Sequence, residues 1–184
     1  MNGRTGTVAA GPADSVPAAR TAGLTPAGSR QWPGMRPWPL FSALGPVGAL
    51  PTAPGLARAF TAMVLGGWDL ARAGDLGETS ALVISELTTN VVRAAAGGDD
   101  TLPYQDGGGL TELWLRLMSD RAVVRIEVWD NLPASAGLPS VRHPGAEDEH
   151  GRGLALVDRL SHRWGCHQIP ALRAKSVWAL LKAR

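Results

Sequence analysis

Two neighbouring strand patterns, joined by a very short link, constrain the fold of this chain more than any other feature. In residues 112–118, ELWLRLM, every second residue is a leucine, and in residues 122–130, AVVRIEVWD, apolar β-branched residues recur at 124, 126 and 128. This period of two is typical of strands with one face buried. Because only Ser119–Arg121 separates the two segments, we expect them to form an antiparallel hairpin.

Further strands are expected before and after this hairpin. The segments 163–168, RWGCHQ, and 175–181, KSVWALL, again show alternation and predict two final strands. A short strand is expected between Leu40 and Leu50, where Gly45 and Pro46 would interrupt it. The sheet would therefore contain four or five strands.

Three helices are expected from the remaining patterns. The first would follow the breaker cluster Pro51–Gly55, and the second would end before the stop signal Gly97–Gly98. The predicted ranges are about 56–70, about 78–96 and about 153–160. The first helix would direct one side toward the core, formed by Leu56, Phe60, Met63, Val64 and Gly67 or Trp68.

These elements predict an α+β fold, a two-layer sandwich with three helices on one face of a largely antiparallel sheet. We expect residues 41–184 to form this single domain. Residues 1–40 are rich in Ala, Gly and Pro and show no periodicity, so we expect a disordered tail. The alternative is a tail that docks through Trp32 and Trp38.

The composition argues against several classes of function. The net charge is +2 and no Lys/Arg cluster occurs, so a DNA-binding regulator is suggested only by the pI of about 9.2. No apolar run is long enough for a membrane span, and the N-terminus lacks the apolar stretch of a signal peptide. The single cysteine, Cys166, is compatible with a reducing cytoplasm and is expected to pack in the core.

Glu86 and Asn90 lie one helical turn apart in the second predicted helix. Residues four apart project from the same helix face, so a carboxylate and an amide would be neighbours there, while Ile84, Leu87 and Val91 lie on another side. The pair could belong to an exposed polar face or to a ligand site, and the spacing alone does not distinguish these.

Asp130 ends the second strand of the hairpin. By the alternation of side chains, it lies on the same face as the apolar residues of that strand. If those residues face the core, the carboxylate faces it too, which is costly unless the group is paired or hydrogen-bonded. Asp130 could cap a turn beyond the strand, or it could accept a hydrogen bond from a ligand in a mainly apolar pocket.

Residues 150–157, HGRGLALV, place two glycines around Arg152 at the start of the third helix. Glycines allow close approach to backbone N–H groups, and a helix N-terminus favours an anion such as phosphate. The segment matches neither a P-loop nor a dinucleotide-binding fingerprint. A glycine-rich helix start without a ligand is the alternative.

The order of these features resembles that of the GHKL superfamily of ATPases and kinases, whose ATP-binding domain is the Bergerat fold. SELTTN (85–90) looks like the N-box, VWDNLP (128–133) like the first glycine box and GRGLALV (151–157) like the second. The chain is most similar to bacterial anti-sigma-factor serine kinases, and AKSVWALL (174–181) is similar to the strand on which they end. The resemblance covers about residues 50–184.

The resemblance implies a Mg-ATP site with a role for each matching position. Asn90 would bind Mg²⁺, a hard cation that prefers oxygen ligands. Glu86 would be the general base, and Asp130 would accept a hydrogen bond from the adenine amino group. Residues 131–150 would be the lid. The other nucleotide-binding residues would be Gly151, Arg152, Gly153, Leu154, Lys175 and Ser176.

The implied function is a cytoplasmic, Mg-ATP-dependent protein serine kinase that acts as an anti-sigma-factor-like regulator. Its substrate would be a serine of an antagonist (anti-anti-sigma) protein, with a sigma factor and a second copy of the chain as further partners, and without nucleic acid or membrane. However, both glycines of the usual Asp-x-Gly-x-Gly box are replaced in Asp130–Ala134. A nucleotide-sensing interaction module with weak or no catalysis, which binds ATP weakly or not at all and acts through partner binding, is therefore the second hypothesis.

Overall fold

A computed structural model of the chain describes residues 38–96, 110–132, 152–169 and 173–183, with the side chains of Arg152 and Ile169 excepted. These residues form three helices and five strands, in the α+β class expected from the sequence. The elements are β1 (Leu40–Gly48), α2 (Ala53–Gly67), α3 (Leu76–Ala95), β2 (Glu112–Ser119), β3 (Val123–Asp130), α4 (Arg152–Leu160), β4 (Arg163–Ile169) and β5 (Ala174–Lys182).

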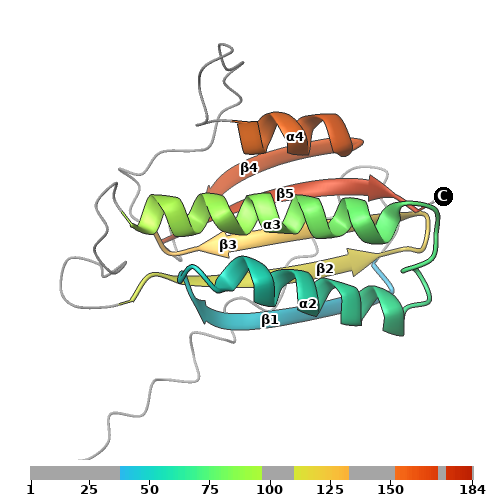
Figure 1. The fold of residues 1–184 in the computed structure, drawn as a ribbon, viewed down its shortest axis with the longest axis horizontal. Helices are drawn as coiled ribbons and strands as arrows, with labels where there is room; N and C mark the ends of the chain where they lie inside the picture. The colour runs from blue at the N-terminus through green and yellow to red at the C-terminus, as the bar shows by residue number, and fades with distance from the viewer. Residues whose placement is uncertain (1–37, 97–109, 133–151, 170–172, 184) are drawn as a thin grey trace, which may run out of the picture. The chain divides into compact units, whose positions relative to one another are not determined.

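The five strands form one antiparallel sheet in the order β1-β2-β3-β5-β4. The predicted hairpin is β2 and β3, and β5 lies between β3 and β4. The helices lie along one face of the sheet, with α3 between α2 and α4 (Figure 1). Since β3 ends where β5 begins, Asp130 lies directly opposite Lys175 in the register.

The core between the helices and the sheet includes the alternating residues of the hairpin and the apolar side of α3. The residues predicted for these three elements are all buried, and partly buried Cys166 packs against the core, as expected. They are Leu113, Leu115, Leu117, Val124, Ile126 and Val128 from the strands and Ile84, Leu87 and Val91 from α3.

The predicted core face of the first helix is partly wrong. Leu56 is 46% exposed and Met63 is 68% exposed. The helix begins at Ala53, earlier than expected, because Pro54 is tolerated in a first turn, where the missing N–H has no partner to lose. The buried side is formed by Ala53, Ala57, Phe60, Thr61, Val64 and Leu65.

The first strand lies within the predicted range, and Gly45 and Pro46 interrupt it as expected. The register shifts between Leu44 and Val47, and pairing with β2 continues to Gly48. A bulge of this kind accommodates an irregular residue while the ladder resumes beyond it.

On the sheet face that the helices do not cover, much of β2, β3 and β5 is also buried, which corrects the expectation of half-buried strands. Glu127 receives hydrogen bonds from Arg125 Nε at 2.6 Å and from Trp129 Nε1 at 2.9 Å, and Arg116 Nη1 lies 3.4 Å from its Oε2. The guanidinium of Arg125 also stacks 4.3 Å from the centre of the Trp178 ring. We call Arg116, Arg125, Glu127, Trp129 and Trp178 the Glu127 network.

None of the described helices is long and apolar enough to cross a membrane. The expected tail, the loop before residue 110 and the expected lid lie outside the described residues, apart from Trp38–Leu40 and Asn131–Leu132.

Candidate functional site

The start of α4 lies against the side of α3 that presents Glu86 and Asn90. A Cβ atom placed on Gly153 would lie only 2.5 Å from Glu86 Oε2 and 3.5 Å from Asn90 Oδ1. Only a residue without a side chain fits there while Glu86 keeps this position. Two segments that are far apart in the sequence, each of which is ambiguous alone, therefore meet in the fold.

This junction combines two kinds of polar group. The first four N–H groups of a helix have no partner within it, so α4 presents them at its first turn. The half-buried side chains of Glu86 and Asn90 contribute carboxylate and amide oxygens beside that turn. The arrangement could bind an anion at the helix N-terminus and a cation at the oxygens.

Other predicted residues near this junction differ in what they can contribute. Gly151 lies outside the described residues, and of Arg152 only the helical backbone is described. Leu154 is buried and its side chain belongs to the hydrophobic core. A ligand could therefore reach Leu154 only through its backbone, and the functional side chains described at this junction are Glu86 and Asn90.

Asp130 lies at the end of β3 on the helix-facing side of the sheet, and it is 0% exposed. Its Oδ1 accepts a hydrogen bond from the backbone N–H of Leu132 at 3.1 Å and lies 3.9 Å from Lys175 Nζ. Its Oδ2 is buried and has no hydrogen-bond partner. A buried acceptor without a partner is costly, which is the observation expected of a group that binds a ligand.

Burial raises the pKa of the Asp130 carboxyl from 3.8 to about 6, although Lys175 and the Leu132 N–H act in the opposite direction. Desolvation is thus the larger effect, because it disfavours the charged form. Near neutral pH the carboxylate is the main form, and it can accept a further hydrogen bond at Oδ2.

Lys175 and Ser176, matched together from the sequence, lie on opposite faces of the sheet. Lys175 pairs with Asp130 in the register and is buried beside it. Ser176 pairs with Trp129, and because side chains alternate along a strand, it lies on the face of the Glu127 network. Of the two side chains, only that of Lys175 therefore lies beside Asp130.

The positions after Asp130, where the sequence departs from the glycine box, have structural contacts. Asn131 Oδ1 accepts a hydrogen bond from the Glu112 backbone N–H at 2.9 Å, which extends the pairing of β2 and β3. Leu132 belongs to the core and holds Asp130 through its N–H. These residues therefore order the end of β3, where glycines would leave it more mobile.

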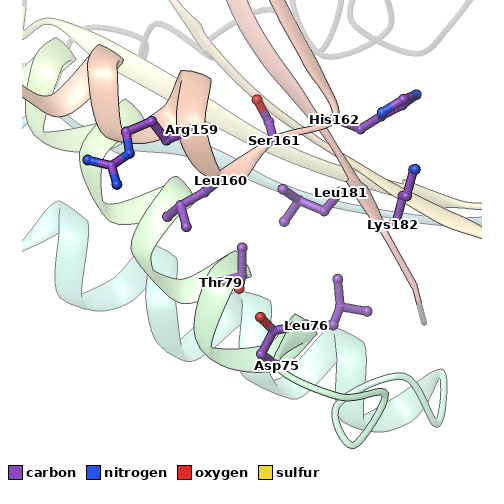
Figure 2. Close-up of a pocket in the computed structure, with 9 residues that line it drawn as sticks. All are labelled: Asp75, Leu76, Thr79, Arg159, Leu160, Ser161, His162, Leu181 and Lys182. Atoms are coloured by element: carbon purple, nitrogen blue, oxygen red, sulfur yellow. The ribbon is translucent and has the colours of Figure 1, made fainter.

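A pocket of about 360 Å³ lies at the opposite ends of α3 and α4 (Figure 2). Leu76, Leu160 and Leu181 contribute its apolar part, and the polar residues around it are mostly exposed. Its lining comes from the start of α3 and the end of α4, whereas Glu86 and Gly153 lie at the other halves of these helices. The full lining is Asp75, Leu76, Thr79, Arg159, Leu160, Ser161, His162, Leu181 and Lys182.

Within the described ranges, no group of three or more His, Cys, Asp or Glu side chains is arranged to hold a metal ion. The candidate site instead offers one carboxylate and one amide oxygen at the α3–α4 junction. Such a pair suits a hard cation that keeps most of its ligands from water or phosphate.

The Glu127 network was not predicted from the sequence. The alternation that predicted the strands placed Arg125 and Glu127 on a solvent face, and the signal for their burial would have been the tryptophans at 129 and 178.

Neither protein-family models nor curated protein sequences give a match to this chain.

Proposed function

We propose that this chain is a Mg-ATP-binding protein serine kinase of the GHKL type, with the Bergerat fold, that acts as an anti-sigma-factor-like regulator. The close approach of Gly153 to Glu86 and Asn90 is the observation that supports it best. Taken separately, the Glu86–Asn90 pair could be an exposed polar helix face and Gly153 could be part of a helix start without a ligand. Neither alternative accounts for the contact between them, whereas a shared site for phosphate and a hard cation does.

The groups present fit Mg-ATP at both of its ends. The N–H groups of the first turn of α4 would hold phosphate oxygens, and Asn90 Oδ1 would be a ligand of Mg²⁺. The unpartnered Asp130 Oδ2 would accept a hydrogen bond from the adenine amino group. When bound, Mg-ATP supplies a transferable phosphoryl group whose negative charge the cation offsets.

Glu86 would act as the general base. Its carboxylate would accept the proton of a substrate hydroxyl as that hydroxyl is phosphorylated, which requires positioning more than unusual reactivity. By resemblance, the hydroxyl would belong to a serine of an antagonist protein, in the cytoplasm, and a sigma factor would compete for the same regulator.

A second candidate function is a nucleotide-sensing module that binds ATP but transfers little or no phosphate. The ordered residues after Asp130 favour it, since Asn131 and Leu132 are held by contacts with Glu112 and Asp130. Phosphoryl-transfer sites that close over their nucleotide need mobile segments, and this end of β3 has none of the expected glycines.

Two measurements test the proposal. Calorimetry with Mg-ATP should show binding by the wild type. Asp130→Asn should bind at least about 10-fold more weakly, because it loses a charge-assisted hydrogen bond. Absence of wild-type binding would exclude both candidate functions. Transfer of labelled phosphate to candidate antagonist proteins should fall at least about 100-fold for Glu86→Gln.

A matched control for Glu86 is Glu78→Gln, which removes an exposed carboxylate from the first turn of the same helix. This variant should retain both binding and transfer. If ATP binds and no transfer is detected to any candidate, the sensing module becomes the better description. If transfer survives Glu86→Gln unchanged, Glu86 is not the base.

A further inference from the structure

The pocket at the start of α3 and the end of α4 lies away from the junction that holds Glu86 and Asn90 (Figure 2). Its volume of about 360 Å³ is within the range of pockets that bind small organic molecules. The candidate ATP site uses the other halves of the same two helices. The proposed function therefore leaves this pocket without a role.

The side chains around the pocket carry more positive than negative charge. Three basic residues line it, namely Arg159, His162 and Lys182, and the single acid among the lining residues is Asp75. Within the described ranges, the side chains of Arg159, His162 and Lys182 form no hydrogen bond or ion pair. Their charge is thus not used to hold the fold together.

The acid next to Arg159 in the sequence does not offset this charge. Asp158 accepts a hydrogen bond from Trp164 Nε1 at 2.8 Å, and it is not one of the residues that line the pocket. Asp75 is exposed at the start of α3. One carboxylate therefore stands against a guanidinium and an ammonium, so the lining attracts an anion.

Leucine side chains form the apolar part of the pocket. Leu76 and Leu181 are each 2% exposed, and Leu160 is partly buried against the same core. Leu160 and Leu181 lie between Arg159 on one side and Lys182 on the other (Figure 2). Since long basic side chains can pack their stems on apolar surface, their head groups can reach an anion that lies over the leucines.

We propose that this pocket is a second binding site, for a phosphate monoester of a small organic molecule. Arg159 and Lys182 would hold the phosphate, whose double negative charge matches two cationic groups better than a carboxylate does. The organic part would lie on the leucines, and the Thr79 hydroxyl would donate a further hydrogen bond. This site does not depend on the proposed ATP-binding function.

The test titrates the full, ¹⁵N-labelled chain with phenyl phosphate and follows the amide chemical shifts by NMR. Phenyl phosphate should bind with a dissociation constant of about 1–10 mM, as expected for a ligand of its size. Inorganic phosphate lacks the apolar part and benzoate lacks the phosphate, so each should bind at least about 5-fold more weakly at the same ionic strength. The amides that shift should include those of Thr79, His162 and Lys182.

A double variant, Arg159→Gln with Lys182→Gln, removes both cations from exposed positions. It should bind phenyl phosphate at least about 10-fold more weakly, through the loss of two charge-assisted contacts. The matched control is Arg93→Gln with Arg173→Gln, which makes the same change of charge at exposed positions near the end of α3 and just before β5. This control should bind like the wild type.

Four outcomes would overturn the proposal. They are equal weakening in the two double variants, equal affinities for phenyl phosphate and benzoate, shifts confined to the amides of Glu86, Asn90 and Gly153, and absence of shifts at about 20 mM phenyl phosphate. The last three are measured on the wild type, so they apply whether or not the variants fold. Binding of Mg-ATP is measured separately, so the proposed function can fail or stand independently of this site.

Discussion

Glu127 and Asp130 are two buried carboxylates on the same strand, three residues apart and on opposite faces of the sheet. Glu127 is 4% exposed, and both of its oxygens are paired, with Arg116, Arg125 and Trp129. Asp130 is 0% exposed, and one of its oxygens has no hydrogen-bond partner. Two carboxylates that are equally buried on one strand therefore differ in how many of their oxygens are paired.

The two environments explain this difference. Around Glu127, two guanidinium groups and an indole N–H supply more donors than one carboxylate can use, and the aromatic rings of Trp129 and Trp178 cover the guanidinium groups. Around Asp130, the described neighbours are core residues such as Leu132 and the ammonium of Lys175, which lies at 3.9 Å. Both oxygens of Glu127 are therefore paired, whereas Asp130 Oδ2 has no hydrogen-bond partner.

The largest expected effect follows from removing Glu127. Glu127→Leu leaves Arg116 and Arg125 buried without their anion, and we expect the free energy of unfolding to fall by about 3–5 kcal/mol. Urea denaturation measures this. The triple variant with Arg116→Met and Arg125→Met added should recover most of the loss, and a loss below about 1 kcal/mol in the single variant would show that the network is not structural.

The second largest effect is expected in the pH dependence of stability, to which Asp130 should contribute. The folded-state pKa of Asp130 is raised to about 6 from 3.8, so its contribution to stability is fully present below about 3.8 and is lost as the pH rises through about 6. The difference corresponds to about 3 kcal/mol. Asp130→Asn should lack this loss, so the wild type should become less stable relative to Asp130→Asn between pH 4 and 7. Parallel pH profiles for the two proteins would contradict it.

Nucleotide affinity should change with pH in the opposite direction to stability, because binding requires the ionised form of Asp130. An ionised carboxylate accepts the stronger hydrogen bond, so wild-type affinity for Mg-ATP should decrease as the pH falls through about 6. The expected decrease is about 10-fold, and the weaker binding by Asp130→Asn should be independent of pH in this range. Calorimetry at pH 5 and pH 8 measures both, with Mg²⁺ held constant.

The smallest effect on stability is expected at Gly153. A Cβ there would displace the Glu86 carboxylate, which is the far end of a flexible, half-buried side chain, so Gly153→Ala should change stability by less than about 1 kcal/mol. Phosphate transfer should nevertheless fall about 10-fold or more through the displaced base. The matched control is Gly66→Ala on α2, where a Cβ meets nothing within 4 Å; an equal effect of both substitutions on transfer would exclude a local cause.

Local periodicity was sufficient for much of this protein. The alternation in residues 112–130 predicted β2, β3 and their hairpin, and the helical spacing placed Glu86 and Asn90 on one side of α3. It was insufficient for the first helix, where Pro54 in the first turn changed the buried side of α2.

Contacts between distant segments were decided only by the tertiary structure. Because β5 lies between β3 and β4, Lys175 faces Asp130 and Ser176 faces Trp129. Because α4 packs on α3, Gly153 meets Glu86. Periodicity depends on neighbours within a few residues, whereas strand order, register and the satisfaction of buried oxygens depend on groups supplied by other elements.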